Sequence, residues 1–243
     1  MHSLMVFGEV GGTVNILSKT DFVGISFFIA CMAMLASAAF FFLERGDVEG
    51  KWKTSVTVAG LITGIAAVHY FYMRDMWVAT GESPTVFRYI DWFITVPLQI
   101  VEFYLILAAI AVVPKSLFWR LLTASIVMLV GGYLGEAGFI SPMLGFIIGM
   151  LGWLYIIYEI FAGEASRINA GSANPACQKA FGALRLIVTV GWAIYPIGYF
   201  LGYLTSGADS NLLNIIYNYA DLINKSAFGL VIWAAAVQDR DSK

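Results

Sequence analysis

Two carboxylates and an arginine interrupt an apolar stretch of the sequence, RYIDWFITVPLQIVEF, which begins at Arg88. Each charge of Arg88, Asp91 and Glu102 would cost roughly 2.5–3.5 kcal/mol at the centre of a membrane. At 3.6 residues per turn, these three share one helical stripe, about 60° wide, with the polar residues Thr95 and Gln99. Because ionisable groups in a membrane normally face the protein interior, the stripe is predicted to point into a bundle of helices.

A lysine lies midway through the last apolar stretch, in NYADLINKSAFGLVIW. Lys225 is too deep for its ammonium group to reach the membrane surface easily, and Asp221 lies one helical turn earlier on the same face. One interpretation is a buried structural ion pair. The other is a lysine that forms a Schiff base with an aldehyde cofactor and is balanced by a nearby carboxylate.

The stripe is expected to face Lys225, which would put Asp91 and Glu102 on opposite sides of a central cationic site. Their separation along a helix is roughly 16 Å at 1.5 Å per residue. Such an arrangement resembles the two ends of a proton path, whereas a purely structural polar stripe is the alternative.

The composition identifies the chain as a membrane protein. Of its 243 residues 60% are hydrophobic and 12% are charged, and the mean hydropathy is +0.80. Soluble domains are roughly 45–50% apolar and 25% charged. The net charge of −2 argues against a nucleic-acid partner. Cys31 and Cys177 lack the spacing of a metal site and are interpreted as packing thiols.

Seven apolar segments, each near the 20 residues that span a bilayer, predict an all-α, seven-helix membrane protein with one domain over residues 1–243. Three of them are preceded by a capping residue and a proline, at Ser83-Pro84, Ser141-Pro142 and Asn174-Pro175. Polar links such as 44–53 and 163–174 separate the spans. The segments are 21–43, 54–78, 84–107, 117–135, 141–162, 177–204 and 211–236.

The distribution of lysine and arginine predicts that the N-terminus lies outside the cell. In that orientation ten basic residues face the cytoplasm and three, Lys19, Arg74 and Arg88, face outward. Residues 1–20 would form a short extracellular segment and residues 237–243 a cytoplasmic tail. The first twelve residues lack the basic and apolar regions of a signal peptide. A signal peptide that preceded these residues and was removed is the alternative left open.

Three motifs resemble those of microbial rhodopsins, and the resemblance covers essentially all seven spans. The run Arg88-Tyr89-x-Asp91-Trp92, followed by Thr95-x-Pro97-Leu98 and Glu102, resembles their third helix. Their sixth helix is resembled by Trp192-x-x-Tyr195-Pro196. Their seventh helix is resembled by Asp221-x-x-x-Lys225.

Within that family the chain looks most like the proteorhodopsins. Asp91, Thr95 and Glu102 match their acceptor–threonine–donor set, and His69 matches the histidine that they pair with the acceptor. A histidine in an apolar helix is otherwise more often a packing residue. The pairing with Asp91 is therefore an implication of the resemblance.

The resemblance implies all-trans retinal joined to Lys225 as a protonated Schiff base, with Asp91 and Asp221 as counterions. Light would move the proton to Asp91, and Arg88 would help to tune this acceptor. Glu102, among apolar neighbours, is expected to be desolvated and neutral at rest, and it would return a proton from the cytoplasmic side. The implied function is a light-driven outward proton pump, a transporter and not an enzyme.

Aromatic residues are expected to form the flat walls of the retinal pocket, although ordinary packing is their usual role in such a chain. The pocket residues implied by family position are Trp92, Thr95, Gln99, Trp153, Trp192 and Tyr195. Gln99 is the position that tunes colour, and glutamine there implies a blue-absorbing type. Pro97 and Pro196 each remove a helix hydrogen bond and are candidate bends near the pocket. Glu136 and Glu82 could serve proton release or be solvated carboxylates at loop ends.

Other classes share parts of this pattern. A photosensory rhodopsin with a slow photocycle is the main alternative, and Glu102 argues against it. A chloride pump is expected to have a neutral residue at position 91, and a sodium pump a different set at 91, 95 and 102. The combination of Asp91, Asp221 and Lys225 weakens a receptor without retinal. The resemblance also implies a homo-oligomer, a pentamer or hexamer, in a bacterial plasma membrane.

Overall fold

The computed structural model describes residues 17–171, 174–205 and 209–242, and within these ranges it contains helices and no strands. Seven spans are long and apolar enough to cross a membrane, which confirms the predicted fold class. Five of them are built on α1 (Phe22–Glu44), α2 (Trp52–Thr80), α3 (Thr85–Ile110), α4 (Lys115–Glu136) and α9 (Ser210–Asp241). The fifth span joins α5 (Pro142–Phe161) to α6 (Glu164–Gly171), and the sixth consists of α7 (Pro175–Leu186), η2 (Ile187–Gly191), α8 (Ile194–Tyr199) and η3 (Phe200–Leu204).

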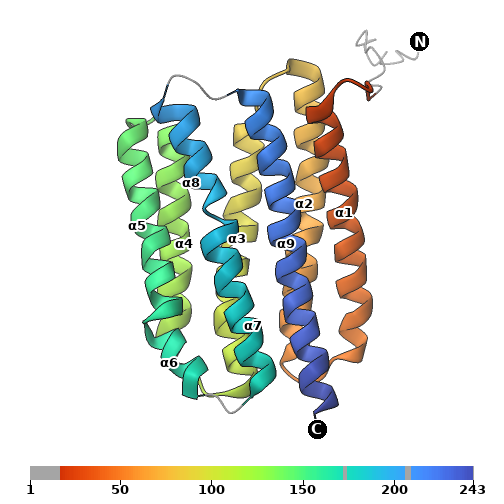
Figure 1. Ribbon diagram of the computed structural model, residues 1–243, viewed down its shortest axis with the longest axis vertical. Helices are drawn as coiled ribbons and strands as arrows, with labels where there is room; N and C mark the ends of the chain where they lie inside the picture. The colour runs from red at the N-terminus through yellow and green to blue at the C-terminus, as the bar shows by residue number, and fades with distance from the viewer. Residues whose placement is uncertain (1–16, 172–173, 206–208, 243) are drawn as a thin grey trace, which may run out of the picture.

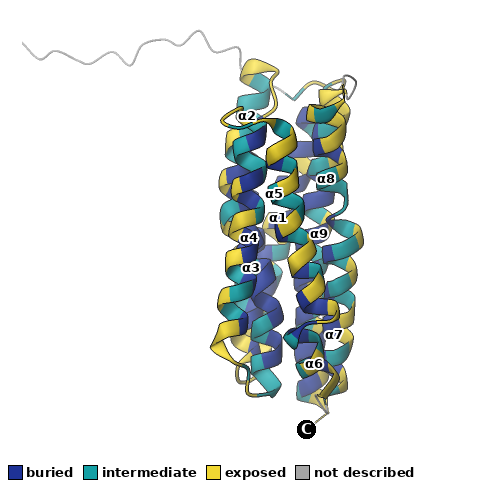
Figure 2. Cartoon of the chain, turned by 90° about the vertical axis from the view of Figure 1, so that its left-hand side faces the viewer, coloured by how far each residue is buried: buried dark blue, intermediate teal, exposed yellow. Residues whose placement is uncertain are grey.

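The spans lie side by side, and α1 begins at one end of the bundle while α9 ends at the other (Figure 1). Buried residues line the inner faces and exposed residues the outer faces, as Figure 2 shows. The outer faces carry large apolar side chains such as Leu43, Leu151 and Ile223. Lipid can cover such a surface because the backbone polar groups are satisfied within the helices.

Two predicted connections differ from the structure. The link at 163–174 contains the helix α6, and the predicted tail at 237–243 is largely the last turns of α9. The tail is held because Asp239 is buried and accepts hydrogen bonds from Trp52 Nε1 and Asn174 Nδ2. Residues 1–16, which include most of the predicted extracellular segment and the region lacking signal-peptide features, lie outside the described residues.

Two of the three predicted helix caps form. The side chains of Ser141 and Asn174 accept hydrogen bonds from Leu144 N and Cys177 N at the starts of α5 and α7. Ser83 does not cap α3, because its hydroxyl instead accepts from Asn214 Nδ2 at 2.7 Å. The Ser83 side chain therefore links the segment before α3 to α9.

The two prolines behave differently. The α-helix α3 continues through Pro97. The sixth span is interrupted on both sides of Pro196, by the π-helical segments η2 and η3. These segments, with five residues each, change which faces of the span meet its neighbours.

The helices α4 and α5 approach closely enough that only glycine fits between them. A Cβ atom on Gly145 would lie 2.7 Å from the Cα of Gly135 and 2.8 Å from the Gly131 carbonyl oxygen. Small residues of this kind allow membrane helices to pack backbone to backbone. The close contact fixes where the last turn of α4 directs its side chains.

Candidate functional site

Lys225 lies at the centre of the bundle between two carboxylates. Its Nζ atom is 2.6 Å from Asp91 Oδ2 on α3 and 2.8 Å from Asp221 Oδ2 on α9. All three side chains are at most 2% exposed. The stripe on α3 thus contacts the lysine on α9, and the buried cation is paired as such a group must be.

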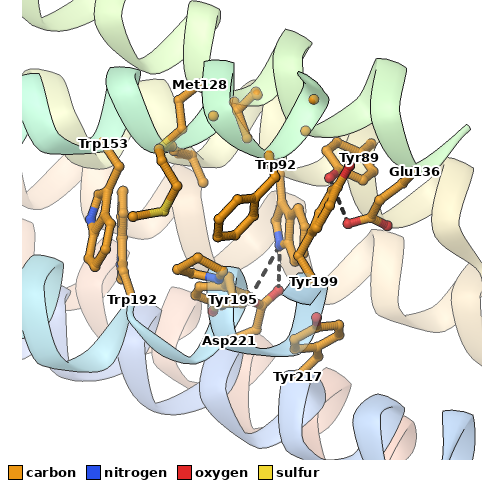
Figure 3. Close-up of a pocket in the computed structure, with 18 of the residues that line it drawn as sticks. Tyr89, Trp92, Met128, Glu136, Trp153, Trp192, Tyr195, Tyr199, Tyr217 and Asp221 are labelled. Atoms are coloured by element: carbon orange, nitrogen blue, oxygen red, sulfur yellow. Dashed lines mark hydrogen bonds between the residues drawn. The ribbon is translucent and has the colours of Figure 1, made fainter. Parts of the chain in front are cut away.

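Asp221 has two further hydrogen-bond donors that fix its carboxylate. Trp92 Nε1 donates to Asp221 Oδ2 at 3.1 Å, and the Tyr195 hydroxyl donates to Oδ1 at 2.5 Å. Donors on α3 and α8 therefore hold the ionised form of this group. Figure 3 shows Trp92 and Tyr195 converging on Asp221.

Asp91 is bound on its other side by Thr95 and His69. The Thr95 hydroxyl donates to the Asp91 carbonyl at 2.9 Å and lies 3.5 Å from Oδ2. The Nδ1 atom of His69, on α2, lies 3.3 Å from Asp91 Oδ1. The imidazole is 19% exposed, so it connects a buried carboxylate to the outer face of the bundle.

Arg88 is held one turn from Asp91 by two asparagines of α9. Its Nη2 donates to Asn214 Oδ1 at 2.9 Å and its Nη1 to Asn218 Oδ1 at 3.2 Å. Sequence reasoning missed both asparagines, although they precede Lys225 by eleven and seven residues and so share its helical face. Polar residues at that spacing in an apolar span were the available signal.

Glu102 lies on the same stripe, three turns beyond Asp91. It is completely buried, and among the described residues the buried Ser55 hydroxyl of α2 lies beside its carboxyl group without a hydrogen bond of good geometry. A buried, unpaired carboxylate would be very costly, so this setting favours a group that carries a proton.

A cavity beside Lys225 lies between α3, α4, α5, α9 and the sixth span. Its lining is mostly apolar and aromatic with a few polar groups, as is typical of pockets that bind a small cofactor. Predicted pocket residues that line it are Trp92, Gln99, Trp153, Trp192 and Tyr195, together with Lys225. The predicted pocket residue Thr95 is not among the lining residues, and its hydroxyl donates to the Asp91 carbonyl.

The cavity also reaches Glu136 and Tyr89, which were not predicted as pocket residues from the sequence. Trp153 and Trp192 lie at one end and Glu136 and Tyr89 at the other, as Figure 3 shows. The Tyr89 hydroxyl donates to Glu136 Oε1 at 2.9 Å. Glu136 is therefore a half-buried carboxylate that lines the cavity, whereas Glu82 is exposed.

These features define the class of protein. The family of bacteriorhodopsin-like proteins matches residues 21–239, and the chain belongs to it. It is a multi-pass membrane protein of the microbial rhodopsin fold.

Within that family the chain is similar to proteorhodopsins over nearly its whole length. It is 54% identical to the green-light absorbing proteorhodopsin of Gamma-proteobacterium EBAC31A08 over 98% of this chain and 94% of the relative. The identity and both coverages are the same for the blue-light absorbing proteorhodopsin of Gamma-proteobacterium Hot 75m4. Identity therefore does not decide the colour.

Solved structures agree with this assignment. The crystal structure of blue light-absorbing proteorhodopsin from Med12 matches with a TM-score of 0.79 and 60% identity, over 90% of this chain and all of that one. The Exiguobacterium sibiricum rhodopsin matches with a TM-score of 0.82 and 32% identity, over 91% and 98% of the two chains. Xanthorhodopsin, described as a light-driven ion pump with dual chromophore, matches with a TM-score of 0.79 and 26% identity, over 93% and 98%.

Proposed function

We propose that this protein is a light-driven pump that moves protons outward across a bacterial plasma membrane, with all-trans retinal bound to Lys225. The observation that carries the proposal is the contact of 2.6 Å between Lys225 Nζ and Asp91 Oδ2 in a fully buried site. The proteorhodopsin relatives and the ion pump xanthorhodopsin support the same class of function.

The cavity residues suit a long, flat and apolar cofactor. Trp92, Trp153 and Trp192 supply planar walls, and Lys225 is the one lysine among the lining residues. Retinal bound there would supply light absorption and an isomerisation that disturbs the ion pair at Nζ.

Asp91 is proposed as the acceptor of the proton that leaves Nζ, since its oxygen lies within direct transfer distance. Asp221 is proposed as the counterion that stays ionised, because Trp92 and Tyr195 donate to it. Two carboxylates in one site thus have different roles, set by their hydrogen bonds.

Direction requires a second proton carrier on the opposite side. Glu102 is proposed as that donor, because it is buried without a charged partner and lies toward the end of the bundle where the basic residues gather. With the N-terminus outside, this end is cytoplasmic. Release on the outer side is proposed to pass Arg88 and Glu136.

The decisive experiment adds all-trans retinal to the apoprotein. We expect a visible absorption band that is lost in Lys225→Ala, and acidification of the medium when cells or right-side-out vesicles are illuminated. A band without acidification and with slow recovery would favour a sensor. No band in the wild-type protein would refute the proposal.

His69 is proposed to tune the acceptor through its contact with Asp91 at 3.3 Å. We expect His69→Asn to move the midpoint of the pH titration of visible absorbance by about one pH unit, since one unit corresponds to roughly 1.4 kcal/mol of interaction. Val68→Ala, at an exposed neighbouring position, is the control. An unchanged midpoint in His69→Asn would contradict the pairing.

Gln99 is proposed to tune the colour toward blue. It lines the cavity, and its Nε2 donates to the Asn224 carbonyl at 3.4 Å. We expect Gln99→Leu to shift the absorption band to longer wavelength, because it removes a polar amide from the cavity wall. Absorption spectra of purified pigments measure this, with the lipid-facing Ile94→Leu as control; no shift, or a shift to shorter wavelength, would refute it.

A homo-oligomer, a pentamer or hexamer, is also proposed from family resemblance. Sedimentation or mass measurement of the detergent-solubilised pigment tests this assembly, and a monomer at all concentrations would contradict it.

A further inference from the structure

The π-helical segment η2 of the sixth span exposes backbone carbonyls to its neighbours. The Val188 carbonyl accepts from Trp153 Nε1 on α5 at 3.0 Å, and the Gly191 carbonyl accepts from Asn224 Nδ2 on α9 at 3.1 Å. Two side chains from different helices thus hold one short segment. Asn224, which supplies the side chain from α9, directly precedes Lys225 in the chain.

Pro196 explains why the Gly191 carbonyl is available. Proline has no N–H, so it cannot donate to the Trp192 carbonyl as a regular helix requires. In a regular helix the Tyr195 N–H would donate to the Gly191 carbonyl. In this span it donates to Trp192 O at 3.1 Å instead. The Asn224 side chain of α9 donates to the Gly191 carbonyl in its place. Side chains commonly satisfy backbone groups where regular helical hydrogen bonds are interrupted.

Glycine at position 191 leaves the room in which the Asn224 side chain makes this contact. A Cβ atom there would lie 2.2 Å from Asn224 Oδ1, far below any normal contact distance. The Asn224 side chain is 5% exposed, so it has little room to move aside without losing its bond to the carbonyl.

Asn224 also contacts the residues that surround Lys225. Its Nδ2 lies 3.4 Å from the Tyr195 hydroxyl, which in turn donates to Asp221. Its backbone carbonyl accepts from Gln99 Nε2 at 3.4 Å. The residue therefore joins the sixth span to the counterion and to the cavity wall on α3.

We propose that Asn224 is a positioning residue that couples the π-helical segment of the sixth span to the ion-pair site of Lys225. This inference rests on the proposed light-driven function. The contact holds the sixth span and Tyr195 in the resting arrangement, and it is released when the site is disturbed. Removing it makes the resting arrangement less favourable and slows the return to it.

The test compares Asn224→Ala, Gly191→Ala and the double variant, each as retinal-loaded protein. Gly191→Ala displaces the Asn224 side chain without changing its chemistry. Gly182→Ala is the matched control, because a Cβ there meets nothing within 4 Å. After a flash, we expect recovery of the resting absorbance to slow about five-fold in each single variant, the effect of about one hydrogen bond, and no further in the double variant.

A spectroscopic readout separates coupling from general loss of structure. Infrared difference spectra of protein with isotope-labelled asparagine are expected to show a light-induced change of a side-chain amide band. The band should be absent in Asn224→Ala and shifted in Gly191→Ala. The recovery and infrared readouts do not depend on proton transport. The coupling can therefore be absent while the medium still acidifies, and it can be present when the medium does not acidify.

Unchanged recovery in both single variants, additive slowing in the double variant, or the same amide band in Asn224→Ala would each overturn the proposal. If Gly191→Ala forms little pigment, the yield becomes the readout. Restoration of the yield by Asn224→Ala supports the contact, and failure to restore it overturns the proposal.

Discussion

Replacement of Asp91 by asparagine is expected to give a coloured protein that no longer transports protons. An amide cannot accept the proton from Nζ, so the initial rate of light-driven acidification should fall by at least about 100-fold, the usual contribution of a positioned proton acceptor. The pigment should still form, because Asp221 Oδ2 stays 2.8 Å from the lysine. The variant thus removes one of two carboxylates and does not isolate a buried cation, which would be far more destabilising.

The measurement pairs pH recordings of illuminated vesicles with visible spectra of the same preparation. Asp75→Asn is the control, since this carboxylate on α2 is 44% exposed and pairs with Arg74 outside the lysine site. Robust outward pumping by Asp91→Asn would remove Asp91 from the proton path. Loss of pumping in both variants would point to a general effect of charge on the outer half.

The sequence predicted the parts of the site that depend on helical periodicity alone. Polar residues in an apolar span are costly, so their common face had to meet another polar group. Lys225 was the basic residue placed midway in a span, and the structure brings Asp91 and Asp221 to it. The same periodicity applied to α9 would have found Asn214 and Asn218 as the partners of Arg88.

Features that depend on packing between helices could not be predicted in this way. Glu136 ends α4 next to a loop, and its inward direction follows from the close contact of Gly135 with Gly145 and from the donor Tyr89. Thr95 has the spacing of a pocket residue but turns its hydroxyl to the Asp91 backbone.

The interruptions of the sixth span were also hidden. A π-helical segment shifts the register of an apolar helix without a change of composition, so periodicity gives no sign of it. Pro196 indicated that the Trp192 carbonyl would lose its donor, but not that the Tyr195 N–H would turn to it and leave the Gly191 carbonyl to Asn224, 28 positions after the proline. Only the arrangement of α8 against α9 relates the two.

Replacement of Glu102 by glutamine is expected to slow the return of the pigment to its resting state by about 100-fold at neutral pH. The carboxyl group is buried, and the Ser55 hydroxyl beside it is far too weak an acid to supply the proton in its place. In the variant the proton must come from the solvent. The recovery rate should then fall about tenfold for each unit of rising pH, since the rate is proportional to the proton concentration, whereas the wild-type rate should be nearly constant near neutral pH.

Flash photolysis between about pH 6 and 9 distinguishes a missing donor from a damaged fold, because a structural defect alone would slow recovery without making it proportional to the proton concentration. Glu49→Gln is the control, as this exposed carboxylate lies in the loop at the same end of the bundle. Recovery in Glu102→Gln that is as fast as in the wild type would exclude Glu102 as the donor. It would also remove the main argument against a sensory role, because a buried proton carrier on the cytoplasmic side is needed for rapid turnover and is not needed for signalling.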